Sequence, residues 1–294
     1  MSHPFEGCWA KWERGQHHVD AIQAHIDELI GPLASRRVAF EPRLESRTPL
    51  RETWIFEGPS EIPDLSPVSV EIGDALNCFR GALDHLAWAT TKRLGTPVSR
   101  LKEAQRRQVS FPLASSWGKY PGAFKRGLPG VSGNSAMGRL VKSYQPCGRG
   151  RRAGVMRALR DLNNRDKHRL LIPAVWLPEG WIHELRASAG VSILSTELLI
   201  DTSRPVPLKP NQPLVRVSYT THTLMSKTHV NLDAKAEFVP AIGRRWWLML
   251  SLQGISSEVL VLLRRAAIAQ DLPTDDAPKP FGPAPDASIG LSHD

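Results

Sequence analysis

Apolar residues recur at helical spacing along much of the chain, and the pattern is clearest in residues 66–94. There Leu76, Phe79, Leu83 and Leu86 lie three or four positions apart. At 100° per residue they share one face, which is the apolar stripe of a helix that faces a core. The same spacing predicts three further helices, over residues 5–31, 151–168 and 255–269.

Alternation of apolar and polar residues predicts strands in two parts of the chain. The candidate strands cover residues 36–40, 52–56, 215–223 and 230–242, and residues 245–252 fit a strand or the start of the last helix. Residues 99–150, rich in glycine, proline and basic residues, are expected to hold short helices near 100–108 and 134–144. The expected fold class is therefore α+β, a helical bundle with a small antiparallel β-sheet.

The order of these elements bears on the domain organisation. We expect one domain over residues 1–270, because helices that could pack together lie on both sides of the strands in the sequence. The sheet should be drawn mainly from residues 36–56 and 180–250. Residues 271–294 hold five prolines and five aspartates, which predicts a disordered, acidic, proline-rich tail.

The helix expected over residues 66–94 has an unusual polar face. Its members are Asp74, Asn77, Arg80, Asp84 and His85. A solvated helix face usually carries Lys and Glu, whereas Asn, Asp and His are poorer helix formers. The presence of these residue types on one face therefore indicates a specific role.

The helix expected over residues 151–168 has a polar face of the same composition. Its members are Arg157, Asp161, Asn164, Arg165 and His168. If the two helices pack together, their polar faces could meet in one partly buried network. Such a network could fix the register of the helices, or it could supply arginine donors for an anion and imidazoles for proton transfer.

A metal site is a further alternative for these two faces. The candidate ligands are Asp74, Asp84, His85, Asp161 and His168. However, the Glu-x-x-His pair of di-iron bundles is absent, and Arg80 or Arg165 would oppose a cation. We therefore expect neither a metal nor another cofactor.

Charge is concentrated in one part of the chain, residues 92–152, which we call the basic segment. It holds fourteen Lys or Arg residues and a single acid, Glu103, so its net charge is +13. The whole chain has a net charge of +9, so the remaining residues together carry −4. Such segregation favours binding of a polyanion such as RNA, although a merely solvated basic face has the same composition. The candidate nucleic-acid contacts are Arg149, Arg151 and Arg152.

Two motifs resemble known proteins. GDALNxxRxALDHLxW at residues 73–88 and LNxxDKHRLL at residues 162–171 resemble a widespread family of uncharacterised bacterial proteins. Arg80, followed after four residues by His85, also resembles the Arg-x4-6-His signature of HEPN domains, which are helical bundles found in RNases and toxins. The resemblance implies a HEPN-like core and, as in that family, a homodimer that cleaves RNA without a metal.

The HEPN resemblance implies roles for two residues. Arg80 would offset charge on the phosphoryl oxygens, and His85 would transfer the proton of the ribose 2′-OH as it attacks phosphorus. Noncatalytic binding of RNA or another anion, and a purely structural network, remain open beside this mechanism. The most apolar run, residues 246–263, is interrupted by polar residues, so we expect no membrane span and a soluble, cytoplasmic protein.

Overall fold

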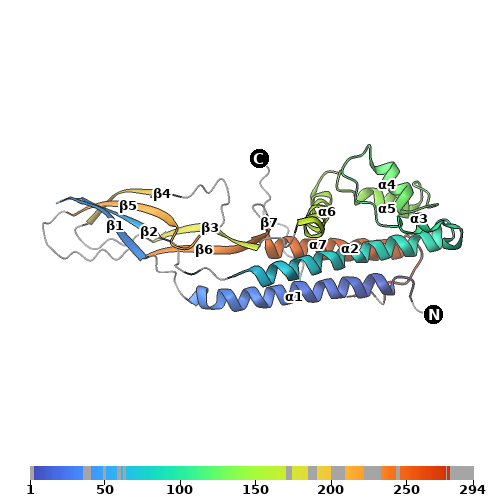
Figure 1. Cartoon of the computed structure of the whole chain (residues 1–294), viewed down its shortest axis with the longest axis horizontal. Helices are drawn as coiled ribbons and strands as arrows, with labels where there is room; N and C mark the ends of the chain where they lie inside the picture. Colours follow the sequence, from blue (N-terminus) through green and yellow to red (C-terminus); the bar gives the residue numbers. More distant parts are fainter. Residues whose placement is uncertain are drawn as a thin grey trace. The chain divides into compact units, whose positions relative to one another are not determined.

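The computed structural model describes residues 3–35, 41–48, 51–57, 61, 64–169, 174–184, 191–199, 209–221, 233–242, 246–275 and 277–278. The fold is α+β, as predicted, with long helices and antiparallel strands (Figure 1). The chain forms two compact units. The helical unit comprises Met1–His17, Asp74–Asn164 and Gln253–Asp294, and the strand unit comprises His18–Gly73 and Arg165–Leu252. The single domain expected over residues 1–270, and its HEPN-like core, stay predictions.

All four predicted long helices are present. They are α1 (Glu6–Ser35), α2 (Ser66–Leu94), α6 (Arg151–Arg169) and α7 (Leu248–Ile268). Helix α1 continues past its predicted end at residue 31 through Pro32, whose fixed φ is compatible with a helix although the residue lacks a backbone donor. The basic segment holds the short helices η1 (Val98–Arg100), α3 (Glu103–Arg106), α4 (Tyr120–Gly127) and α5 (Ala136–Ser143).

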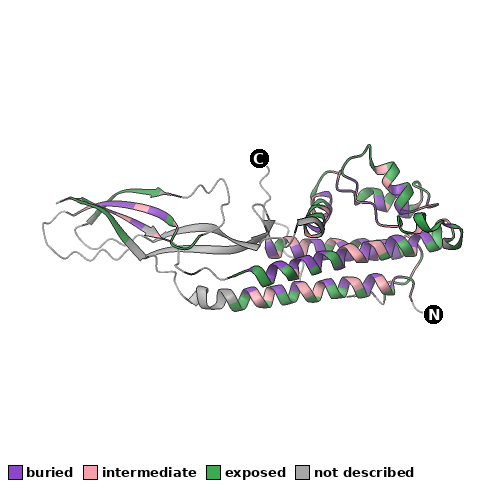
Figure 2. Cartoon of the chain, in the orientation of Figure 1, coloured by how far each residue is buried: buried purple, intermediate pink, exposed green. Residues whose placement is uncertain are grey.

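A capping contact and an apolar stripe explain why residues 66–94 form helix α2. Asp64 accepts a hydrogen bond from the backbone N–H of Ser66 at 2.8 Å, which satisfies a free donor at the start of α2. The predicted apolar stripe from Leu76 to Leu86 is fully buried. Figure 2 shows the result as buried positions that recur turn by turn along α2.

Within the helical unit, the long helices contact one another through specific side chains. The indole N–H of Trp12 in α1 donates to the carbonyl of Ser256 in α7 at 2.9 Å. Helices α1 and α2 approach so closely at Gly15 that a Cβ there would lie 2.7 Å from the ring of Phe79. These contacts join segments from both ends of the chain into one core.

In the strand unit, the described strands form two antiparallel sheets where we expected one. The first has the order β1-β2-β5-β4 and the second the order β3-β6-β7. Their bounds are β1 Glu41–Thr48, β2 Arg51–Glu57, β3 Ala174–Glu184, β4 Val191–Leu198, β5 Pro213–Thr221, β6 Asp233–Ile242 and β7 Trp246–Trp247. Strand β1 lies between the strands predicted over residues 36–40 and 52–56, and was not itself predicted. Residues 36–40 lie outside the described residues.

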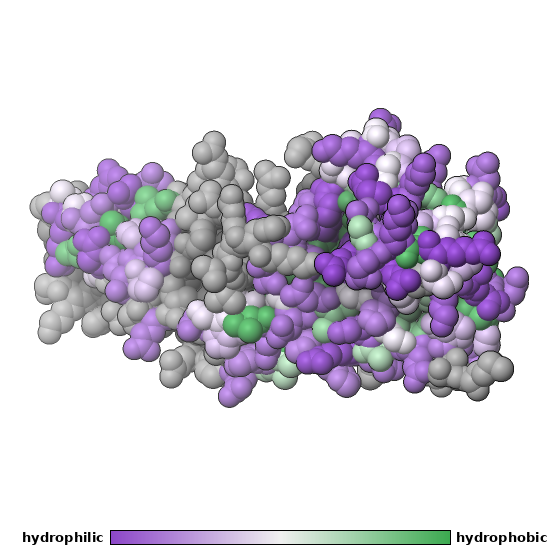
Figure 3. All heavy atoms as spheres, turned by 45° about the vertical axis from the view of Figure 1, so that its right-hand side comes forward, coloured by the Kyte–Doolittle hydropathy of each residue, from purple (hydrophilic) through white to green (hydrophobic). Residues whose placement is uncertain are grey.

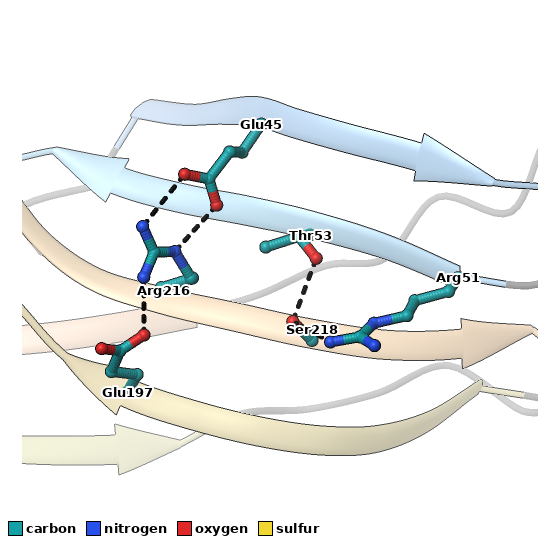
Figure 4. Close-up of polar contacts among 6 residues, drawn as sticks. All are labelled: Glu45, Arg51, Thr53, Glu197, Arg216 and Ser218. Carbon is teal, nitrogen blue, oxygen red and sulfur yellow. Dashed lines mark hydrogen bonds and ion pairs between the residues drawn. The ribbon is translucent and has the colours of Figure 1, made fainter.

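One face of the four-stranded sheet carries an ion-pair row. Arg216 on β5 donates to Glu45 on β1 at 2.8 and 3.0 Å and to Glu197 on β4 at 2.6 Å (Figure 4). Beside it, the hydroxyls of Thr53 and Ser218 are 3.0 Å apart. The ion pairs are solvent-exposed, so they specify strand register more than they stabilise the sheet.

The predicted tail begins with residues that pack on the helical unit. The carbonyl of Pro273 lies 3.1 Å from the imidazole Nε2 of His3, and Ala277 is buried. Residues 279–294 lie outside the described residues. In the part of the chain that is described, no helix combines the length and the apolar composition that a membrane crossing needs.

Candidate functional site

The predicted catalytic arginine forms an ion pair within its own helix. Arg80 Nη2 lies 2.8 Å from Asp84 Oδ1, and Arg80 Nε donates to Asp84 Oδ2 at 3.1 Å. The two residues are one helical turn apart on the polar face of α2, where such pairs meet. The Arg80 side chain is 16% exposed and that of Asp84 is 36% exposed.

This ion pair forms hydrogen bonds with both backbone groups of Phe111. Asp84 Oδ1 accepts from the Phe111 N–H at 2.9 Å, and Arg80 Nη2 donates to the Phe111 carbonyl at 2.9 Å. Residues 110–114, which we call the strap, form neither helix nor strand, so their backbone groups need partners from elsewhere. The polar face of α2 supplies both partners for Phe111, whose own ring is buried.

Two further side chains hold the rest of the strap. Gln145, which is 1% exposed, donates to the carbonyl of Pro112 at 2.8 Å and accepts from the N–H of Ala114 at 3.0 Å. Arg160 on α6 donates to the carbonyl of Ala114 at 3.4 Å. The strap therefore links α2 to α6. Neither Gln145 nor Arg160 was predicted from the sequence as a site residue.

The predicted residues of α6 find partners near their own helix. Arg157 donates to the carbonyl of Pro146 at 2.9 and 3.2 Å, and Asp161 pairs with its neighbour Arg160 at 2.7 Å. Asn164 is exposed. The carboxylate of Asp161 therefore pairs within α6.

Three further members of the predicted network are exposed. Asp74 and Asn77 are exposed on α2, and Arg165 is exposed in the strand unit. The side chain of His168 lies outside the described residues.

Helices α2 and α6 nevertheless approach each other within the strand unit. There the Asp166 carboxylate occupies the space that a Cβ at Gly73 would need, with Oδ1 2.5 Å from that position.

His85 is exposed and has a different environment from Arg80. A Cβ at Gly7 of α1 would lie 2.7 Å from His85 Nδ1, so the imidazole packs against α1. The guanidinium of Arg80, in contrast, is directed to Asp84 and the strap. A carboxylate at 2.8 Å offsets the charge with which Arg80 would bind a phosphate.

The basic segment presents its charge to solvent. Its Lys and Arg residues are all exposed except Arg106 and Arg152, which are half-buried. Hydrophilic residues predominate on the face of the helical unit that is visible at the right of Figure 3. Within the described part of the chain, Arg107 pairs with Glu103 at 3.1 Å, whereas Arg149 and Arg151 contact no carboxylate.

Arg152, the third predicted nucleic-acid contact, is half-buried and packs against other side chains of the helical unit. Its guanidinium carbon lies 4.5 Å from the ring centre of Tyr144, and its Nε lies 3.6 Å from Glu258 on α7. Burial raises the pKa of Tyr144, so its hydroxyl stays protonated beside these charges. Arg152 therefore joins α6 to α7 through a cation–π contact and an ion pair.

Comparison of the chain with known protein families, with curated proteins and with solved structures finds no match. Among the described residues, no group of three or more His, Cys, Asp or Glu side chains could hold a metal ion. The chemistry of the site follows from its own geometry. That geometry consists of a neutralised Arg80–Asp84 pair engaged by the strap, next to a strongly basic exposed surface.

Proposed function

We propose that the helical unit is a noncatalytic RNA-binding module, and that the basic segment is its binding surface. The observation that carries this proposal is the exposure of nearly all the cations of a segment that bears +13. Exposed cations without carboxylate partners keep their full attraction for phosphates. Neutralising RNA phosphates releases condensed counterions, which supplies affinity without sequence preference.

The Arg80–Asp84 pair supports a structural role for the polar face of α2. The Arg80 guanidinium and the Asp84 carboxylate form hydrogen bonds with each other and with the backbone of Phe111. In this proposal the pair positions the strap, which in turn connects the parts of the basic segment on either side of it. The HEPN-like mechanism with Arg80 and His85 as catalytic residues, and the accompanying homodimer, stay predictions.

Salt dependence of binding tests the proposal. We expect the protein to retain labelled oligouridylate on a filter. A plot of the logarithm of the association constant against the logarithm of the salt concentration should have a slope of about −0.7 for each phosphate contacted. Arg149→Gln with Arg151→Gln should flatten this slope, since both side chains are exposed. Arg152 is left unchanged, because its contacts with Tyr144 and Glu258 would be lost.

A matched control removes the same charge elsewhere. Arg14→Gln with Lys209→Gln lowers the net charge by two at exposed positions outside the basic segment. If this control flattens the slope as much as the Arg149 and Arg151 pair, the binding is a property of total charge. The proposed surface would then be wrong, as it would be if the protein retained no RNA at low salt.

The same RNA separates binding from cleavage. Incubation in EDTA should leave the oligonucleotide intact while it stays bound. Cleavage that survives EDTA and is lost in His85→Ala would contradict the noncatalytic proposal and favour the HEPN-like mechanism. Because His85 is exposed, this substitution should leave the unfolding midpoint nearly unchanged.

A further inference from the structure

An exposed indole lies at a corner of the basic segment. Trp117, just before α4, is 47% exposed although it is one of the largest apolar side chains. Its ring packs edge-on against Tyr120 with the centroids 5.8 Å apart, and Tyr120 packs against Phe124 at 5.7 Å. Phe124 is buried, so this row of rings anchors Trp117 to the core while one part of the indole remains open to solvent.

The loop opposite the indole is held in place. Arg157 donates to the carbonyl of Pro146 at 2.9 Å, and the N–H of Gly148 donates to the carbonyl of Gln145 at 2.9 Å. A Cβ at Gly148 would lie 3.9 Å from Cζ2 of Trp117, so the loop and the indole are neighbours. The corner is thus formed by hydrogen-bonded backbone on one side and edge-packed rings on the other.

Cations flank this corner. Lys119 follows Trp117 after one residue, and Arg149 follows Gly148 directly. Both are exposed, and neither contacts a carboxylate among the described residues. A partly exposed aromatic ring with cations nearby in the chain is an arrangement with which proteins bind single-stranded nucleic acid, because any base can stack while its phosphates meet the charges.

We propose that Trp117 stacks on a base of single-stranded RNA while Lys119 and Arg149 hold the neighbouring phosphates. This inference rests on the proposed RNA binding and names the contact that would separate single strands from other polyanions. Paired bases are already stacked on each other, so a duplex of equal charge gains nothing from the indole. Trp117 therefore gives the basic segment a preference for unpaired RNA.

The test compares a 15-nucleotide oligouridylate with heparin, a polyanion without bases. Trp117→Ala should weaken binding of the oligouridylate about tenfold, which is the loss typical of one stacked base, and leave heparin binding unchanged. Trp117→Phe keeps a π-face and should retain most of the affinity. The matched control is Trp88→Ala, which removes an indole that is 39% exposed on α2 outside the basic segment and should leave both ligands bound as before.

The outcomes distinguish this inference from the proposed function. Unchanged oligouridylate binding by Trp117→Ala would overturn the stacking inference and leave RNA binding in place. Equal losses for oligouridylate and heparin would also overturn it, because Trp117 would then act only by shaping the surface. If the unaltered protein binds neither ligand, the proposed function itself fails. Thermal unfolding midpoints of all variants show whether each one is folded.

Discussion

At the scale of the residue, the Arg80–Asp84 pair is expected to stabilise the strap. Arg80→Ala would leave the Phe111 carbonyl and the Asp84 carboxylate without their charged donor. Hydrogen bonds to charged groups contribute about 1.5–3 kcal/mol each, and Asp84 is partly solvated, so we expect a loss of about 2–3 kcal/mol. Urea unfolding at neutral pH measures it.

Two further variants separate geometry from charge at this position. Arg80→Lys keeps the charge but cannot donate to Asp84 and Phe111 as a planar fork, so its loss should be intermediate. Arg126→Ala removes an exposed cation and should change stability by less than about 0.5 kcal/mol. An Arg80→Ala midpoint equal to that of Arg126→Ala would show that the strap does not depend on the pair.

The sequence identified the polar face of α2 but not what it binds. Periodicity placed Arg80 and Asp84 on one side of a helix, because that pattern depends only on local geometry. Their partner, Phe111, lies in a strap without regular structure and carries no periodic signal. Backbone groups are the same in every residue, so the sequence could not show that they are the ligands of this pair.

At the scale of the element, close packing of α1 on α2 depends on glycine. In Gly15→Ala the new methyl group would lie 2.7 Å from the buried ring of Phe79, which has no room to move. The alanine gains about 1 kcal/mol of helix propensity but overpacking costs roughly 1–3 kcal/mol, so we expect net destabilisation. Thermal unfolding measures the sign.

Gly254 in α7 is the matched control for this substitution. A Cβ there meets nothing within 4 Å, so Gly254→Ala should gain the propensity alone and stabilise the protein by about 0.5–1 kcal/mol. The two substitutions are chemically identical and should have opposite signs. The same sign for both would contradict the packing of α1 on α2.

Long amphipathic helices could be predicted from the sequence, whereas short elements that depend on partners could not. The bounds of α2 match the prediction because capping and apolar spacing act within the segment. Strand β1 is rich in charged residues and has a single apolar residue, Leu44, so its own sequence carries no alternating strand pattern. Helix α4 has a proline in its first turn and contains two glycines, so its sequence gives little sign of a helix.

At the scale of the whole molecule, the uneven distribution of charge was evident from the sequence, whereas the exposure of the individual cations was not. Composition gave the +13 of the basic segment, because counting needs no structure. It could not show that Arg152 is engaged with Tyr144 and Glu258 while Arg149 and Arg151 remain open. Those differences arise from tertiary contacts, and they decide which cations can meet a ligand.

Alkaline pH should destabilise the protein through groups in both units. Burial raises the pKa of Cys8 to about 12, and burial, followed by the charge of Cys147, does the same for Tyr120. In the strand unit, burial and then a hydrogen bond to Glu52 raise the pKa of Tyr219 to about 12. Unfolded thiols ionise near pH 8.5 and tyrosines near pH 10, so the unfolded chain binds fewer protons than the folded one above these values.

The sign of the pH dependence follows from that difference in bound protons. Stability from these groups is fully present below about pH 8 and is lost as the pH rises toward 12. Between pH 9 and 10 the urea midpoint should fall, with Cys8 alone contributing up to about 1.4 kcal/mol per pH unit. Cys8→Ala should flatten this decline relative to the unaltered chain, since it removes the thiol that ionises first. A midpoint that stays constant from pH 8 to pH 10 in the unaltered protein would show that these groups are not buried as the fold requires.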